Sequence, residues 1–315
     1  MKTLYILLVL ILLAVGGYFY YDSTKVENIT MGLADGPAAK LLVSVIKDRG
    51  IDTKNHLNIS AIYSDPGETL RKLEERVDGI VAGTYPVLSL PKANKDGKKL
   101  RVFVPYLFSD LDLVVKADSP YQTLEDMKGQ SIGIRPKSSA GYQALAIAVN
   151  LTGLSLEKDF KLAFGSIGEN IQFLTGGQVA ATILAPLGSG DLLAGGKYRL
   201  LSNLRERWEK ETGALMPFSS ITAYQDWIEA NPQTMKRLRA TILEAQNYIV
   251  SNPDIINQYK DLLEIKTEKG LENIKSRLVN TYAVKWDPET HRLLLKKAAE
   301  LGFVEPAQFD EFFID

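Results

Sequence analysis

The 315-residue chain contains no cysteine, which excludes disulfide bonds, thiolate metal ligands and cysteine nucleophiles. It has only two histidines, His56 and His291, and neither adjoins a serine or carboxylate cluster that would predict a catalytic triad. The sequence also has no Walker phosphate loop and no His-x-x-x-His metal pair. We therefore expect no catalytic residues, no metal and no cofactor, and predict that the protein is not an enzyme.

An excess of charge of one sign is lacking as well. The 37 basic residues nearly balance the 38 acidic ones, and no basic run with interleaved aromatics occurs. We therefore expect no nucleic-acid partner. The chain is long enough for two compact lobes, and its 45% hydrophobic content can supply a core for each.

The longest uncharged apolar run lies at the N-terminus, from Leu4 to Gly17, and aromatic residues extend it to Tyr21. Two interpretations stay open: a secretory signal peptide with Ala14 and Gly16 before the cleavage site, or an uncleaved membrane anchor. A lipoprotein signal would need a cysteine. We assign residues 1–27 to this segment and its polar linker, and expect the rest of the chain to be periplasmic or at the extracytoplasmic face of the cell membrane, secreted or anchored.

From Asn28 onward the chain repeats a pattern of strand, polar turn and helix. Strands are predicted at 29–33, 57–63 and 77–83, and the first and third lead into the turns Asp35-Gly36-Pro37 and Thr84-Tyr85-Pro86. In an open α/β sheet, the carboxyl ends of the strands border the ligand crevice. These turns are therefore predicted to line a binding cleft.

The pattern of strand, turn and helix changes after a predicted surface loop at 91–99. Strands are expected at 100–105 and 111–116 with no long helix between them, which indicates a crossing into a second lobe. The chain is predicted to return at 216–221 and to be helical thereafter. The predicted lobes are lobe I, residues 28–106 and 216–315, and lobe II, residues 107–215.

The turn that follows the predicted strand at 132–134 has the chemistry of an anion site. Ser138 or Ser139 is expected to cap a helix that begins near Ala140. Free backbone N–H groups and the positive end of a helix dipole would then face whatever lies above the sheet. Arg135 stands beside them and is expected to be solvated or to bridge the lobes, with neutralisation of an anion as the alternative.

Four segments in this order resemble the solute-binding proteins of ABC importers in the taurine, alkanesulfonate and nitrate group. They are residues 77–86, 124–139, 176–181 and 231–253. The resemblance spans residue 28 to the C-terminus and implies an α/β type II periplasmic-binding-protein fold, in which two lobes close on a ligand cleft by hinge motion. It also implies delivery of the ligand to an ABC-transporter permease, and we expect a monomer.

Carried over by position, the resemblance implies cleft residues in both lobes. Hydroxyls of Thr84, Ser138 and Ser139 would bind the ligand, and Tyr85 or Tyr142 would supply an aromatic wall. The candidate ligand-binding residues are Gly36, Pro37, Thr84, Tyr85, Arg135, Ser138, Ser139, Tyr142, Ala185 and Pro186.

The expected ligand is a small organic anion such as a sulfonate. The alternatives are a heteroaromatic vitamin precursor resembling the thiamine pyrimidine, or an enzyme of the same fold. The sequence departs from the family pattern at Lys137, Gly141, Ala180 and Ala185. These departures bear on the identity of the ligand and not on the fold.

Overall fold

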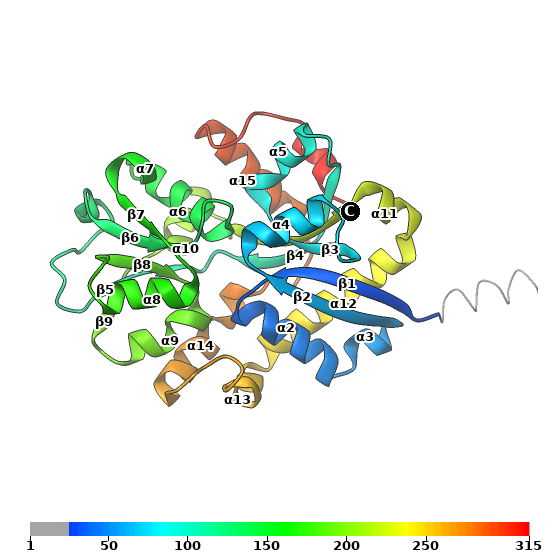
Figure 1. Cartoon of the computed structure of the whole chain (residues 1–315), viewed down its shortest axis with the longest axis horizontal. Helices are drawn as coiled ribbons and strands as arrows, with labels where there is room; N and C mark the ends of the chain where they lie inside the picture. Colours follow the sequence, from blue (N-terminus) through cyan, green and yellow to red (C-terminus); the bar gives the residue numbers. More distant parts are fainter. Residues whose placement is uncertain (1–24, 315) are drawn as a thin grey trace, which may run out of the picture.

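The computed structural model describes residues 25–314 (Figure 1). Of the predicted export segment, residues 1–24 lie outside the described residues. Between residues 25 and 314, no helix combines the length and the apolar character needed to cross a bilayer.

The first of two five-stranded sheets has the strand order β2-β1-β3-β10-β4. Its first three strands run parallel, and β10 pairs antiparallel with both β3 and β4. In β2, Leu57 and Ile59 are buried while Asn58 and Ser60 are exposed, the alternation expected of a strand with one covered face. The strands are β1 (Glu27–Ala34), β2 (Leu57–Ser64), β3 (Ile80–Pro86), β4 (Leu100–Phe108) and β10 (Pro217–Tyr224).

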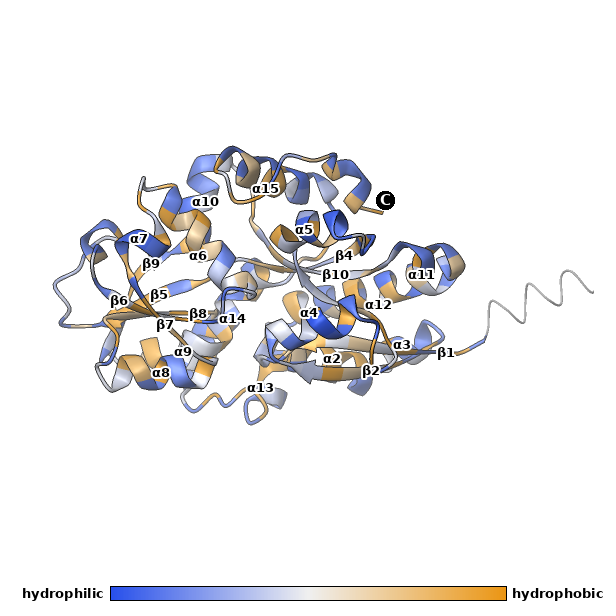
Figure 2. Ribbon diagram, turned by 45° about the horizontal axis from the view of Figure 1, so that its top comes forward, coloured by the Kyte–Doolittle hydropathy of each residue, from blue (hydrophilic) through white to orange (hydrophobic). Residues whose placement is uncertain are grey.

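The second sheet has the order β7-β6-β8-β5-β9, in which β6 runs parallel to β7 and β8 and β5 runs antiparallel to β8 and β9. Its central strand β8 is buried along its whole length. Figure 2 shows largely hydrophobic strands in this sheet, with helices of mixed character around them. The strands are β5 (Asp112–Lys116), β6 (Ser131–Ile134), β7 (Lys161–Phe164), β8 (Ala181–Leu184) and β9 (Tyr198–Asn203).

Helices cover both sheets, and α2 shows how the sequence specifies them. Pro37 occupies its first turn, and Leu41, Leu42, Val45 and Ile46 recur at helical spacing and are at most 1% exposed. The α-helices are α2 (Pro37–Asp48), α3 (Ile51–Lys54), α4 (Pro66–Glu74), α5 (Leu90–Lys95), α6 (Ala140–Asn150), α7 (Leu156–Asp159), α8 (Ile167–Thr175), α9 (Pro186–Ala194), α10 (Leu204–Thr212), α11 (Gln225–Ala230), α12 (Pro232–Ser251), α13 (Ile256–Tyr259), α14 (Glu268–Thr281) and α15 (Pro288–Glu300). Short 3₁₀ helices are η1 (Val87–Ser89), η2 (Glu125–Met127), η3 (Pro253–Ile255) and η4 (Phe309–Phe312).

The two sheets form two α/β lobes, which confirms the predicted fold class (Figure 1). The chain leaves the first sheet after β4 and returns to it at β10. The lobe boundaries at 106/107 and 215/216 stay a prediction. The helix α14, which follows β10, packs against α9 of the second lobe.

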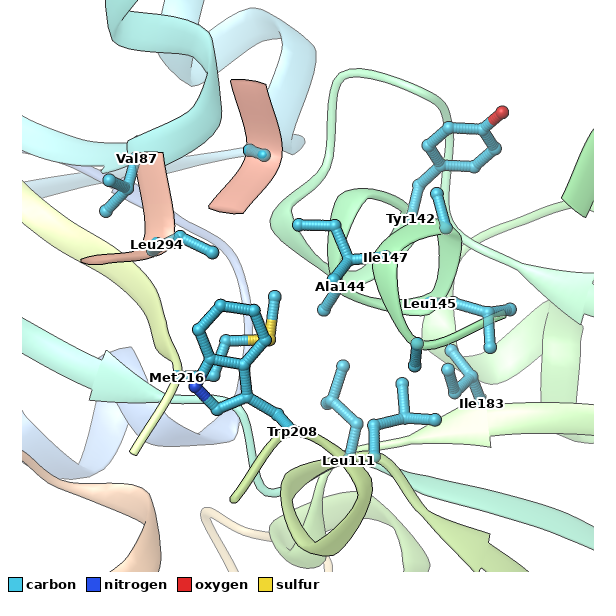
Figure 3. Packing of buried hydrophobic residues seen from close by; sticks show 14 of the residues in the cluster. Val87, Leu111, Tyr142, Ala144, Leu145, Ile147, Ile183, Trp208, Met216 and Leu294 are labelled. Carbon is cyan, nitrogen blue, oxygen red and sulfur yellow. The ribbon is translucent and has the colours of Figure 1, made fainter. Parts of the chain in front are cut away.

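A single buried apolar cluster continues from one lobe into the other. Val87 and Leu294 of the first lobe lie opposite Ala144 of α6, with Met216 and Trp208 beside them (Figure 3). The two lobes are therefore in packed contact along one flank of the cleft.

Two local predictions are wrong. Residues 91–99, predicted as a surface loop, largely form α5, because Pro91 suits the first turn of a helix and Leu90 and Ala93 are buried in the core. The predicted turn Thr84-Tyr85-Pro86 is instead the last part of β3, since it pairs with β10. That partner strand lies more than a hundred residues away and leaves no local signal.

Candidate ligand-binding cleft

A cavity of about 170 Å³ lies between the two lobes. Its walls include the residues at the carboxyl ends of β1, β6 and β8, the strand ends that the sequence pattern indicates. Of the predicted site residues, seven line this cavity: Gly36, Pro37, Thr84, Arg135, Ser139, Ala185 and Pro186.

Five helices of nine or more residues begin at the cavity wall, namely α2, α4, α6, α8 and α9. Gly36 precedes α2 and Ala185 precedes α9, and neither helix has a side-chain cap. Ser139 caps α6, and Ala140 and Gly141 of its first turn also line the cavity. Since the first N–H groups of a helix lack intrahelical acceptors, these helices direct donors and positive dipole ends at the cavity.

Arg135 is the basic side chain among the residues that line the cavity. Its side chain is 15% exposed and lies 3.6 Å from Asp65, which belongs to the first lobe. Burial lowers the pKa of Arg135, while the charges of Asp65 and Asp35 oppose that shift. A guanidinium stays protonated in proteins, so Arg135 brings a partly desolvated positive charge to the cavity.

Two hydroxyls from opposite lobes are oriented by backbone hydrogen bonds. The Oγ1 of Thr84 accepts from the N–H of Ala34 at 2.8 Å, and the Oγ of Ser139 accepts from the N–H of Tyr142 at 3.2 Å. A hydroxyl that accepts one bond still has its own proton to donate. Both groups are thus suited to donate to a bound ligand, and Ser139 combines this with its role as a helix cap.

The overall architecture matches solved structures of binding proteins. The alkanesulfonate-binding protein SsuA from Xanthomonas axonopodis pv. citri, bound to MOPS, has a TM-score of 0.71 at 16% identity, over 92% of this chain and 99% of that chain. The periplasmic aliphatic sulphonate binding protein SsuA from Escherichia coli has a TM-score of 0.68 at 18% identity, over 91% and 92%. This chain has the periplasmic-binding-protein fold. A Candida albicans gene product described as exhibiting that generic fold has a TM-score of 0.68 at 10% identity, over 91% and 96%.

No family model and no curated protein matches the sequence. The two SsuA structures confirm the suspected resemblance to sulfonate-type binding proteins in the fold, at identities of 16% and 18%.

Three predicted site residues do not line the cavity of this periplasmic-binding-protein fold. The Tyr85 hydroxyl donates to Glu74, because strand alternation turns Tyr85 to the opposite face of β3 from Thr84. The Tyr142 hydroxyl donates to Glu157 and points away from the apolar cluster beside it (Figure 3). Ser138 lies at the rim, where its Oγ would be 3.1 Å from a Cβ added to Gly67 of α4.

Several lining residues were not among the predicted site residues, because they come from segments that are distant in the sequence. Phe218 and Ser219 belong to β10, and Thr281 ends α14. Tyr106 and Phe108 of β4 also line the cavity, and their aromatic character is the sequence signal that could have identified them. Apolar side chains thus dominate the part of the cavity away from Arg135.

The fold brings His291 next to a serine that is distant in the sequence. The Oγ of Ser220 lies 2.7 Å from Nε2 of His291. Ser220 is 0% and His291 1% exposed, and burial lowers the pKa of His291 to about 4. Ser220 follows Ser219 on β10 and does not line the cavity, so the pair is a contact within the core.

Among residues 25–314, no group of three or more histidine, aspartate and glutamate side chains is arranged to hold a metal ion. The polar groups that line the cavity are hydroxyls, backbone N–H groups, Arg135 and two carboxylates, Asp35 and Asp110.

Proposed function

We propose that the protein binds a small organic anion with an apolar body, such as a sulfonate, in the cleft between its lobes and delivers it to an ABC importer without chemical change. The observation that carries this proposal is the convergence of five helix N-termini and Arg135 on a cavity that is otherwise largely apolar. Backbone N–H groups, a guanidinium and oriented hydroxyls form the donor set that a tetrahedral or planar anionic head accepts.

The cavity volume limits the size of the ligand. A cavity of about 170 Å³ is similar to an engineered apolar cavity of about 150 Å³ that holds a benzene molecule. The apolar body of the ligand is therefore one ring or a short alkyl chain. Leu70, Phe108 and Phe218 line the cavity and supply the apolar contacts.

The two acidic groups at the cavity already have cationic partners, which argues against a ligand that carries an ammonium group. Asp35 lies 3.0 Å from Lys40, and Asp110 is paired with Arg205 and Arg277. An ammonium placed in the cavity would lose its hydration without gaining a carboxylate. We therefore expect a simple alkanesulfonate to bind more tightly than taurine.

Delivery to a permease and an extracytoplasmic location are part of the same proposal. Support comes from the sulfonate-binding and periplasmic descriptions of the similar structures and from the apolar N-terminal run. We further propose that the protein is monomeric and is either secreted or held at the membrane by residues 1–27.

The second candidate is a binding protein for a heteroaromatic vitamin precursor. Tyr106, Phe108 and Phe218 line the same cavity and favour it. The first candidate ranks higher because Arg135 and the helix N-termini complement a negative charge, which a neutral ring lacks.

Thermal-shift measurements on the chain from Lys25 to Asp315 test both candidates. A ligand at a hundred times its dissociation constant stabilises the folded state by about 2.7 kcal/mol. We expect 1-butanesulfonate to raise the melting temperature, taurine to raise it less, and an aminopyrimidine to leave it unchanged. Stabilisation by the aminopyrimidine alone would favour the second candidate, and turnover of any of the three compounds would refute binding without catalysis.

A further inference from the structure

A pair of buried carboxylates lies at the wall of the cavity, in the connection between the two lobes. Asp110 lines the cavity and is 2% exposed, and Asp112, the first residue of β5, is 0% exposed. A buried carboxylate beside the binding site would repel an anionic ligand unless its charge were compensated. The partners of these two carboxylates therefore bear directly on what the cavity accepts.

Arg277 reaches both carboxylates from α14, a helix that follows β10. Its Nε and Nη2 lie 3.0 and 2.8 Å from the two oxygens of Asp110, and its Nη1 lies 2.5 Å from Asp112. Burial alone would lower the pKa of Arg277, but hydrogen bonds to Asp110 and Asp112 outweigh that effect and raise it. The guanidinium is thus fixed between the two acids.

The other partners do not replace this charge. Asn203 donates to Asp110 at 2.9 Å and to Asp112 at 3.0 Å, but it is neutral. Arg205 lies 3.3 Å from Asp110 and also pairs with Glu209 at 2.6 Å, so its charge is shared. Removal of Arg277 would leave two buried acids with one shared cation.

The end of α14 adds to the negative potential at the cavity. Thr281, which lines the cavity, is the last residue of α14, and the Thr281 hydroxyl donates to the carbonyl of Arg277 one turn earlier at 3.1 Å. The C-terminal end of a helix carries a partial negative charge. Without Arg277, the two carboxylates and the helix end would make this wall of the cavity repel anions. The positive charge of Arg277 offsets that repulsion.

We propose that Arg277 is a positioning residue that sets the charge preference of the cavity, because it neutralises Asp110 and Asp112 and so allows an anion to bind. Arg277 does not line the cavity and acts through Asp110. The effect of Arg277 on the electrostatic potential in the cavity does not depend on which ligand binds. Its consequence for anion affinity rests on the proposed function.

The first test needs no ligand and uses the absence of cysteine in the chain. Ala140→Cys, introduced in the full chain, places one thiol at the N-terminus of α6 on the cavity wall. We expect Arg277→Gln to raise the pKa of that thiol by about one unit, which slows its alkylation by iodoacetamide at pH 7 about tenfold. Lys95→Gln, which removes an exposed charge paired with Glu305, is the control and is expected to leave the rate unchanged. Equal rates with and without Arg277→Gln would overturn the proposal.

Compensating variants separate charge from structure. Arg277→Lys keeps the charge and is expected to keep the fast alkylation rate, and Asp112→Asn combined with Arg277→Gln restores the balance and is expected to recover that rate. If Arg277→Gln alone does not fold, Asp112→Asn is compared with the Asp112→Asn, Arg277→Gln double variant. The double variant must then react about tenfold more slowly, and equal rates would refute the role of Arg277.

A second readout uses two ligands of nearly the same shape. The ratio of the dissociation constants of 1-butanesulfonamide and 1-butanesulfonate measures the preference for an anion. We expect Arg277→Gln to lower this ratio about tenfold, which corresponds to one pKa unit of electrostatic discrimination. If the unsubstituted protein binds neither compound, the proposed function fails, whereas the thiol measurement still decides the role of Arg277.

Discussion

Gly67 of α4 and Ser138 face each other across the rim of the cleft, and cysteines at both positions are expected to lock the lobes together. A Cβ built on Gly67 lies 3.9 Å from the Cβ of Ser138. Disulfides hold their Cβ atoms about 3.5–4.5 Å apart, so this separation suits a disulfide bond. The closed loop of roughly 70 residues should stabilise the folded state by about 4 kcal/mol.

The effect on ligand exchange follows from the position of the bond. Because it joins the two lobes beside Arg135, it blocks the opening through which a ligand would leave, and we expect 1-butanesulfonate to dissociate at least about tenfold more slowly. Stopped-flow exchange on the oxidised double variant measures this rate. The same variant after reduction provides the reference, and Gly67→Cys and Ser138→Cys alone show whether either substitution acts by itself.

Two results would count against this reasoning. If no disulfide forms under mild oxidation, the rims do not approach each other in solution as they do in the structure. If the bond forms and the melting temperature rises but exchange stays fast, the ligand does not pass between α4 and the turn before α6.

The remaining predictions concern single side chains. Arg135→Gln should weaken 1-butanesulfonate binding by about 1.5–3 kcal/mol, measured by calorimetry, because a charged hydrogen bond is lost. It should change stability little, since its partner Asp65 is exposed. Ser139→Ala should cost about 1 kcal/mol of stability in urea unfolding as well as affinity, whereas Ser138→Ala should cost neither. A larger loss from Ser138→Ala would contradict the placement of these serines. The pKa of His291 is about 4 in the folded state and 6.5 unfolded, so the unfolded chain binds the proton first as the pH falls. Stability is therefore unaffected above pH 6.5 and declines by about 3 kcal/mol between pH 6.5 and 4, and His291→Gln should remove that part of the slope in denaturant titrations.

The turns that follow β1, β6 and β8 could be predicted from the sequence, because their signals are local. The predicted cap at Ser139 and the helix that begins at Ala140 are both present, since a serine before an apolar helical period satisfies the first N–H groups wherever the helix lies. The starts of α2 and α9 are also marked locally, by a proline in the first turn after Gly36 and after Ala185. Each of these features depends on fewer than ten consecutive residues.

The misplaced residues share a different cause. Tyr85 faces away from the cavity because β10 extends β3 by pairing Ser220 with Tyr85 and Ile221 with Thr84. The Arg277–Asp110 contact joins residues 167 positions apart. Pairings at such distances depend on how the lobes pack, and one sequence alone carries no local pattern for them.

The positions at which the sequence departs from the resemblance do not bear equally on the ligand. Lys137 is 59% exposed, binds Glu157 at 2.6 Å and does not line the cavity, so its replacement would leave the site unchanged. Ala185 does line it, at the start of α9. An acid there would accept from the free N–H groups of α9 and add a negative charge that Arg277, already shared by two carboxylates, is not placed to neutralise. Alanine at this position keeps the helix start free, in agreement with the proposal that the cavity binds a negative head with an uncharged tail.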